Sequence, residues 1–304
     1  LQLLHQFEEA TTFGSLIQPC LDEQNITFAR HMIEAKDFGG GLFLRETHAK
    51  VLRVLDQAEM LCQRYHVVVA NPPYMGSGAM NSSLKSFVNQ QYPAGKGDLY
   101  ACFILRNLNF VKVRCLVGMI TIPNWMFLGS FAGLRESLLT WHSIHSLLHN
   151  GRGVWGSDFG SCSFVLIRGL PQTEGIFRRL FERQGEVKSV AELELAFFDR
   201  GRFPEFRAST EDLRVLPSSP IAYSVSNRMR AIYKSGEPIS TYAETASGLQ
   251  TNDNNRFIRY WFEVQQTRIG LGCRSREESK ASGRKWFPHV KGGSYRKWYG
   301  NLDY

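Results

Sequence analysis

A short apolar run followed at once by a proline-rich turn constrains this 304-residue chain more than any other feature. Val67-Val68-Val69-Ala70 has the composition of a buried parallel strand, and Asn71-Pro72-Pro73-Tyr74 follows it directly. The carboxyl end of a parallel strand is the usual place for a site in an α/β sheet. The two prolines hold φ near about −65°, so the pattern predicts a stiff site at the tip of a strand.

The chemistry of this turn suits transfer of a methyl group to a planar amine. The Asn71 side-chain oxygen and the Pro72 carbonyl are acceptors, and Pro73 has no N–H to compete for that carbonyl. Two acceptors that hold the amine hydrogens raise the electron density on nitrogen, and Tyr74 offers a face for a flipped-out base, worth about 1–3 kcal/mol. The alternative is an exposed Pro-Pro-Tyr ligand of a small peptide-binding domain, but such ligands do not follow a core strand. We therefore predict that Asn71, Pro72, Pro73 and Tyr74 are catalytic.

The composition limits the class of protein and the cellular compartment that this chain can belong to. The chain is 43% hydrophobic and 21% charged, as in ordinary globular proteins. It has neither a long apolar run nor a secretory signal pattern, so we expect no membrane span and a cytoplasmic location. The six scattered cysteines favour reduced thiols. Pro19-Cys20 resembles the nucleophile dipeptide of cytosine-carbon methyltransferases but lacks a preceding strand. The chain does not begin with Met, and we expect it to be part of a longer product.

Helical and strand patterns alternate along the first two thirds of the chain. This alternation predicts an α/β sandwich with a mostly parallel sheet. A boundary follows at Leu216-Pro-Ser-Ser-Pro220, and then a short amphipathic helix with Ser224 as its cap. The expected helices cover 47–65, a segment opened by Asp98, and 130–139, and the further strands cover 116–122, 144–148 and 163–167.

Two other patterns invite a functional interpretation. The small-residue segment Met75–Met80 is expected to be mobile and to close over a substrate. His142, His145 and His149 suggest a metal site, but in an extended segment His142 does not share a face with the other two. No cysteine or carboxylate completes the set, so we expect no metal.

The end of the chain is basic and aromatic. From Thr251 to Tyr304 there are eleven Lys/Arg and five Asp/Glu, a net charge of +6, together with ten aromatic residues. This mixture suits a polyanion with stackable bases, and a solvated face over a small core is the alternative. The amide-rich segment Gly248–Phe257 either makes base or phosphate contacts or forms a polar turn. The residues expected to contact DNA are Gln250, Thr251, Asn252, Arg256, Lys291, Tyr295, Arg296, Lys297 and Trp298.

Several motifs beyond the turn resemble one family. Together they are similar to the adenine-specific DNA methyltransferases of bacterial BREX phage-exclusion systems, which are related to fused restriction-modification enzymes. The motifs are Phe13-Gly-Ser-Leu-Ile17, Asn71-Pro-Pro-Tyr-Met-Gly76, Lys96-Gly-Asp-Leu-Tyr100, Gly118–Leu128, Gly248-Leu-Gln-Thr251, Trp261-Phe-Glu-Val264 and Lys291–Tyr299.

The resemblance implies a fold, a cofactor and a division into domains. It implies an α/β fold in which a partial Rossmann-like methyltransferase sheet precedes the start of a target-recognition region. Residues 1–215 are then the later part of a catalytic domain, 216–247 a linker and helix, and 248–304 the start of the recognition region. The family uses S-adenosylmethionine, but its glycine-rich donor signature is absent, and Gly39-Gly40-Gly41 is better interpreted as a loop. We expect the donor-binding units to precede Leu1, and the donor-binding residues are unknown.

Three functional hypotheses remain. The first is a DNA N6-adenine methyltransferase that acts on double-stranded DNA with a flipped adenine, in phage defence and with other defence-system subunits as possible partners. The second is a non-catalytic fragment that binds DNA or a partner protein, which the missing donor signature and the basic end favour. The third keeps the catalysis but changes the substrate to a protein glutamine or an RNA.

Overall fold

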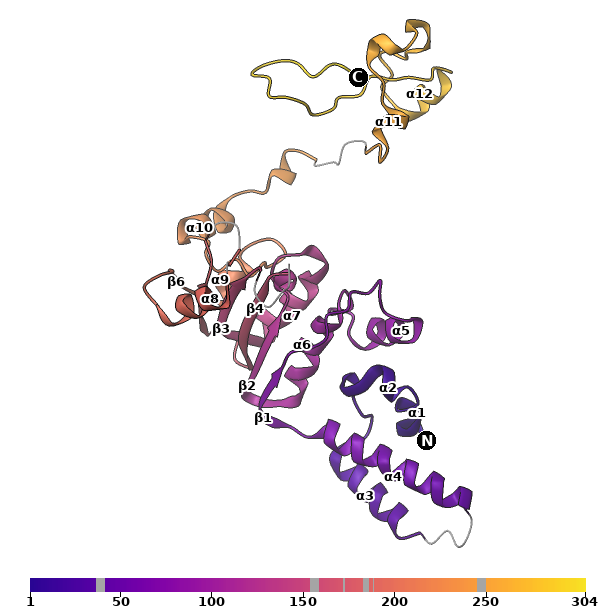
Figure 1. Ribbon diagram of the computed structural model, residues 1–304, viewed down its shortest axis with the longest axis vertical. Coiled ribbons are helices and arrows are strands. Elements are labelled where there is room, and N and C mark those ends of the chain that lie inside the picture. The colour runs from indigo at the N-terminus through magenta and orange to yellow at the C-terminus, as the bar shows by residue number, and fades with distance from the viewer. Residues whose placement is uncertain (37–41, 154–158, 172, 183–185, 188, 245–249) are drawn as a thin grey trace. The chain divides into compact units, whose positions relative to one another are not determined.

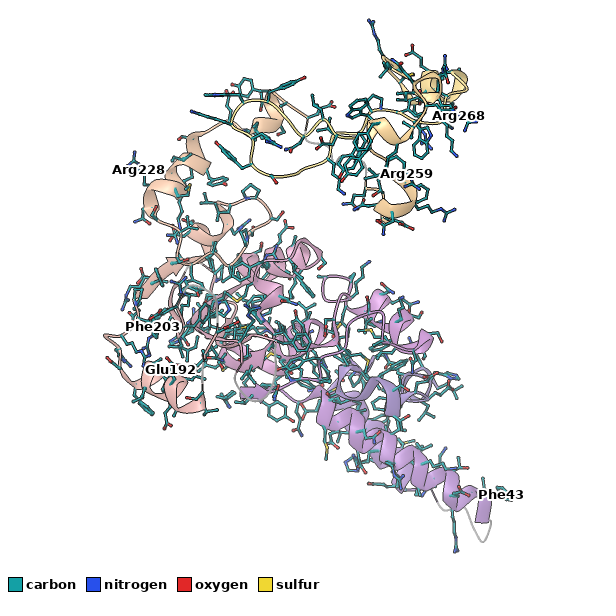
Figure 2. The ribbon with its side chains drawn as sticks, turned by 45° about the horizontal axis from the view of Figure 1, so that its top comes forward. Phe43, Glu192, Phe203, Arg228, Arg259 and Arg268 are labelled. Atoms are coloured by element: carbon teal, nitrogen blue, oxygen red, sulfur yellow. The ribbon has the colours of Figure 1, made fainter. Side chains whose placement is uncertain are left out.

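The computed structural model describes every residue except 37–41, 154–158, 172, 183–185, 188 and 245–249 (Figure 1). The chain divides into two compact units, Leu1–Gly236 and Glu237–Tyr304. The first unit contains the sheet and the Asn71–Tyr74 turn. The second contains most of the basic and aromatic motifs of the chain's end.

A small helical subdomain opens the first unit. The long pair α3 (Glu23–Glu34) and α4 (Leu42–Cys62) packs as a hairpin, and Asp22 caps α3 by accepting a hydrogen bond from Asn25 N at 2.8 Å. Their shared core includes Ile26, which is fully buried. The preceding short elements are α1 (Gln2–Gln6), α2 (Ala10–Phe13) and the 3₁₀ turn η1 (Gly14–Leu16).

Six strands form a single mixed sheet in the order β1-β2-β4-β3-β5-β6. β1 and β2 are parallel, as are β3 and β5, whereas β4 runs antiparallel to both its neighbours and β6 runs antiparallel to β5. The carboxyl ends of β1, β2, β3 and β5 therefore lie at the same end of the sheet. The strands are β1 (Tyr65–Ala70), β2 (Val111–Thr121), β3 (His142–Gly151), β4 (Ser161–Arg168), β5 (Glu174–Arg179) and β6 (Glu205–Ser209).

The α/β fold class predicted from the sequence is confirmed, and so are its four expected strands. Two details differ. The sheet is mixed rather than mostly parallel, because β4 and β6 return in the opposite direction. β1 is also not buried: it is an edge strand in the described structure, and Val67 and Val69 are 56% and 79% exposed.

Two helices, α6 (Leu99–Phe110) and α7 (Ala132–Trp141), cover one face of the sheet. Their apolar stripes meet the inward side chains of β2, β3 and β4 in the main core, where Ile104 and Leu134 are fully buried. Asp98 caps α6, as the sequence predicted. The remaining helices of the first unit are α5 (Ser82–Gln91), α8 (Val190–Phe198), α9 (Thr210–Arg214) and α10 (Asn227–Ser235).

The segment after α9 remains packed on the first unit. Ile221 is fully buried in the main core, and its backbone N–H donates to Met126 O at 2.8 Å. Ser226, not Ser224, caps α10, because the helix begins two residues later than the sequence pattern suggested. This compact unit runs to Gly236.

The second unit has short helical elements and little core. Among its described residues only Gly270 is buried. A Cβ there would approach the Phe287 ring to 2.5 Å, so the glycine allows a close backbone-to-ring contact. The elements are η4 (Ile239–Thr241), α11 (Asn254–Phe257), η5 (Trp261–Glu263), η6 (Gln266–Arg268) and α12 (Arg276–Ala281).

Candidate active site

The Asn71–Tyr74 turn leaves the sheet at the carboxyl end of β1. Pro72 is buried, whereas Asn71, Pro73 and Tyr74 are exposed. The Tyr74 hydroxyl lies 2.9 Å from Asn71 Oδ1 and 3.3 Å from the Ile120 carbonyl at the end of β2. A hydroxyl has one proton, so it donates to one of these acceptors at a time. When it turns to Ile120, the Asn71 oxygen is left for another donor.

The start of the next segment is tied to the cap of α6. Met75 N donates to Asp98 Oδ1 at 3.0 Å, and Leu99 N donates back to Met75 O at 3.0 Å. Ser77 N adds a bond to Gly97 O at 3.1 Å. The sequence predicted a mobile segment over 75–80, but its first residues are anchored. Asp98 both caps α6 and accepts a hydrogen bond from the Met75 backbone. Burial raises the pKa of Asp98 although these N–H groups stabilise its charge.

Aromatic rings form the floor beneath Tyr74. The Tyr100 ring meets the Tyr74 ring edge-on at 6.1 Å, and Phe131 lies 5.8 Å from Tyr100. Burial raises the pKa of Tyr74, so its hydroxyl stays protonated and remains a donor at neutral pH. Tyr74 is still 48% exposed, which leaves part of its ring for a ligand.

A cleft of about 430 Å³ opens beside this turn, between β1 and α6. Asn71 and Pro72 line one side, and Phe103 and Asn107 of α6 line another. Asn107 Nδ2 donates to the Met119 sulfur at 3.4 Å, so its amide is fixed in position. A cleft of this size suits a small organic ligand. None of the lining residues, all of them described, is acidic.

Sequence reasoning missed the residue that holds the far wall of this cleft. Arg106 is buried and donates to the carbonyls of Ser15, Ile17 and Leu61 at 2.8, 2.8 and 3.0 Å. Its guanidinium also lies 3.8 Å above the Phe110 ring. Burial lowers the pKa of Arg106 to about 10. The sequence did contain one signal of this role, because Arg106 lies within the apolar stripe of the α6 helix.

Comparison with known proteins identifies the family to which this arrangement corresponds. Residues 21–155 match the model of the Eco57I restriction-modification methylase family. The chain is 33% identical over 253 residues to the adenine-specific methyltransferase PglX of Lacticaseibacillus casei (strain Zhang), covering 80% of this chain and 20% of that protein. It is 31% identical over 312 residues to the adenine-specific methyltransferase BrxX of Escherichia coli O9:H4 (strain HS), covering 100% of this chain and 25% of that protein.

The chain is homologous to the PglX and BrxX adenine-specific methyltransferases. The family predicted from the motifs is thereby confirmed, although the chain spans only a quarter or less of the length of these relatives. Among solved structures, a modification subunit of a putative type I restriction enzyme from Vibrio vulnificus YJ016 matches with a TM-score of 0.41 and 13% identity, over 62% of this chain and 47% of that chain. The type IIG restriction endonuclease BpuSI matches with a TM-score of 0.41 and 17% identity, over 55% of this chain and 21% of that chain.

His142, His145 and His149 of this PglX- and BrxX-like chain lie along β3. Burial lowers the pKa of His142 and of His149 to about 4 in each case, with added repulsion from Arg168 and Arg179 respectively. His145 is exposed beside a register shift. Within the described residues, no cluster of three potential metal ligands occurs, and no helix is long and apolar enough to cross a membrane.

The residues expected to contact DNA lie in two segments of the second unit. Gln250, Asn252 and Arg256 are exposed, and Thr251 is half-buried. Asn252 has φ of +56°, and Asp253 caps α11, so part of this segment does form the polar turn that was the alternative interpretation. Gly248 and Leu249 of the same motif lie outside the described residues.

The second segment is a closed loop at the end of the chain. His289 N donates to Tyr304 O at 3.2 Å and closes its base, and Asn301 Nδ2 reaches Ser294 O at 3.3 Å across it. Tyr295 and Trp298 are each 87% exposed. Lys297 and Lys291 lie over the rings of Trp298 and Tyr304 at 5.3 Å, and Arg296 is exposed beside them. We call residues 289–304 the C-terminal loop.

Proposed function

We propose that this chain supplies the catalytic turn and part of the target-recognition surface of a DNA N6-adenine methyltransferase that acts in phage defence. The observation that carries the proposal is the Asn71–Tyr74 turn, held at the carboxyl end of β1 beside a cleft. The similarity to PglX and BrxX supports adenine as the target. A cytoplasmic location, where the DNA is, belongs to the same proposal.

Each residue of the turn has a distinct task in this mechanism. The amine of a flipped adenine donates one hydrogen to Asn71 Oδ1 and the other to the Pro72 carbonyl, to which no described residue donates. Tyr74 moves its hydroxyl to Ile120 O and stacks its ring on the base. The acceptors are in place before the reaction, so they stabilise the positive charge that develops on nitrogen. S-adenosylmethionine supplies an electrophilic methyl group, and the proton lost from the amine passes to solvent.

The donor fits the residues of the cleft only in part. Phe103 and Asn107 suit a purine, but the cleft lacks a carboxylate for the ribose hydroxyls. We propose that the remaining donor contacts come from a segment that pairs with the outer edge of β1. The unpaired edge and the exposed Val67 and Val69 support this arrangement.

The domain division belongs to the proposal as well. Residues 1–215 would be the later part of the catalytic domain, 216–247 the linker and helix, and 248–304 the start of the recognition region. Gln250, Thr251, Asn252, Arg256, Lys291, Tyr295, Arg296, Lys297 and Trp298 would contact DNA.

Methyl incorporation tests the proposal directly. Labelled S-adenosylmethionine is incubated with duplex DNA, RNA or protein in the presence of the longest polypeptide that contains this chain, as wild type or Asn71→Ala. We expect label in duplex DNA only, and much less with the variant. Full activity of Asn71→Ala, or label in RNA or protein alone, contradicts the assignment.

The second candidate is a DNA- or partner-binding role without turnover. It is favoured by the absence of acidic residues from the described lining of the cleft and by the net charge of +6 after Thr251. Calorimetric titration with S-adenosylmethionine of the longest polypeptide that contains this chain separates the two, because the first candidate takes part of its donor contacts from a further segment. Micromolar binding counts against the second candidate.

A further inference from the structure

The turn after β2 presents two apolar side chains to solvent. Trp125 and Met126 of this turn are fully buried, whereas Phe127 and Leu128 are each 49% exposed. Large apolar side chains that are adjacent to one another at a surface can form a contact site for a partner. We call Phe127 and Leu128 the apolar tip.

The backbone of the apolar tip is held from both sides. Phe127 N and Leu128 N donate to Asn124 O at 3.2 and 3.0 Å. Buried Arg135 donates through Nη1 to the carbonyls of Trp125 and Leu128 at 2.9 and 2.8 Å. A backbone that is already held in place loses less conformational entropy when the exposed side chains bind a partner.

Arg135 also fixes the segment that packs behind this turn. Its Nε and Nη2 donate to the carbonyl of Ser218, at 3.2 and 2.8 Å, and Nε also lies 3.1 Å from the Ser219 carbonyl. Ser218 and Ser219 adopt positive φ values of 64° and 48°, a conformation that costs energy in residues other than glycine. The turn is therefore held between the core and a second segment of the chain.

The apolar tip and the amine acceptors both lie at the end of the sheet where β1 and β2 have their carboxyl ends. The turn follows β2, whose Ile120 carbonyl lies 3.3 Å from the Tyr74 hydroxyl. Phe131, at the end of the same turn, contacts the Tyr100 ring that supports Tyr74. On the other side, the Phe127 ring lies 6.3 Å from that of His149, near the carboxyl end of β3.

We propose that Phe127 and Leu128 are an apolar wedge that enters the duplex beside the target and occupies the space vacated by the flipped adenine. The inference rests on the proposed function and adds a second contact with the same substrate. Flipping a base costs a few kcal/mol of stacking and pairing, and apolar side chains inserted between base steps replace part of the lost stacking. DNA is the expected occupant because the apolar tip follows β2, whose carboxyl end contacts the turn that would receive the adenine.

Base flipping and methyl transfer are measured separately to test the wedge. The target adenine is first located by single-molecule sequencing of methylated DNA and then replaced by 2-aminopurine, whose fluorescence rises when it leaves the stack. In the longest polypeptide that contains this chain, Phe127→Ala/Leu128→Ala should lower two quantities by about 10-fold or more, from the stacking energy involved. They are the fluorescence gain on the fully paired 2-aminopurine duplex and kcat/KM for methyl transfer on the same duplex with adenine at the target. A duplex with an abasic site opposite the target should restore both, because flipping no longer requires the wedge.

Trp141→Ala is the matched control. Trp141 is 66% exposed and directly precedes β3, so it lies at the opposite end of the sheet from the apolar tip. Base flipping and kcat/KM should therefore remain at wild-type values. Phe127→Tyr keeps a planar ring and should retain most of the fluorescence gain. Thermal melting of each variant verifies that it is folded.

The outcomes separate the wedge from the proposed function. Wild-type flipping by Phe127→Ala/Leu128→Ala overturns the wedge, and so does a defect that persists on the abasic duplex. Asn71→Ala should still flip the base while methyl transfer falls by about 100-fold or more. Absence of DNA methylation by the wild-type protein, or full activity of Asn71→Ala, overturns the proposed function instead.

Discussion

The two units of the chain differ in the burial of their aromatic residues: the first has both buried and exposed rings, whereas no described ring of the second is buried. In Leu1–Gly236, rings such as Trp125 and Tyr100 are buried around the sheet and support an exposed turn. In Glu237–Tyr304, Tyr295 and Trp298 point to solvent and the only buried residue described is Gly270. Catalysis requires acceptors that are fixed before the substrate arrives, whereas recognition requires side chains that are free to meet it. We therefore expect mutations in the first unit to change turnover and stability, and mutations in the second to change affinity.

The largest effect should follow from Asn71→Ala. Loss of one preorganised acceptor should reduce single-turnover methyl transfer by about 100-fold or more, while DNA affinity stays unchanged. Rapid-quench assays and fluorescence anisotropy measure the two quantities. Asn89→Ala is the control, because Asn89 is exposed on α5 and bonds only to Lys85 O in the same helix. A parallel loss of DNA affinity would break the division of tasks between the units.

Replacing Arg106 should give the next largest effect. Arg106→Met leaves the carbonyls of Ser15, Ile17 and Leu61 without their donor, and the free energy of unfolding of the first unit should fall by about 3 kcal/mol. Urea unfolding followed by tryptophan fluorescence measures this change. Arg53→Met, at an exposed position of α4, should change it by less than about 0.5 kcal/mol. Equal effects of the two variants would show that Arg106 does not hold the subdomain.

These contacts show why only part of the site could be predicted. The β-branched run of β1 and the proline turn are local patterns, so the strand and the position of Asn71 followed from the sequence. The role of Arg106 depends on carbonyls up to 91 residues away, which no local pattern reveals. The exposure of Val69 was missed for the same reason, because it depends on which segments lie beside β1 and cover its face.

The missed strands illustrate the limit on the fold. β5 has the sequence Glu-Gly-Ile-Phe-Arg-Arg, whose apolar run is too short to stand out. It is specified by its neighbours: Phe177 is fully buried in the main core, and its partner in β6 is Phe206. Gly175 is required there because a Cβ would come within 2.1 Å of Ile144 O. Strands of this kind are specified by tertiary packing rather than by local propensity.

Acid should destabilise the first unit by an amount comparable with the effect of Arg106→Met. Burial lowers the pKa of His142 and His149 from 6.5 to about 4, so the folded state binds fewer protons than the unfolded state between these values. The stability they confer is full above pH 6.5 and falls as the pH drops toward 4, by about 1–2 kcal/mol per histidine after allowance for solvent screening.

Protonation of His142 also removes the acceptor of Gly169 N, which lies 3.1 Å from Nδ1. Urea midpoints measured from pH 8 to pH 4 test the pH dependence, and His149→Phe should reduce it, because the ring then packs with Phe127 and Phe181 without a titrating group. A steeper fall in the variant would assign the acid sensitivity to other groups.

The smallest effects should come from single charges of the C-terminal loop. Arg296 and Lys297 are exposed, so Arg296→Ala or Lys297→Ala should each weaken DNA binding several-fold, by about 1 kcal/mol, and reduce the slope of log affinity against log salt by about 1. Lys36→Ala, an exposed lysine of the first unit, should leave the slope unchanged. Turnover at saturating DNA should stay at the wild-type value in all three variants, since the acceptors of Asn71 and Pro72 are untouched. If turnover falls with affinity, the C-terminal loop helps to place the adenine, and the contrast between a fixed catalytic unit and an outward-facing binding unit no longer holds.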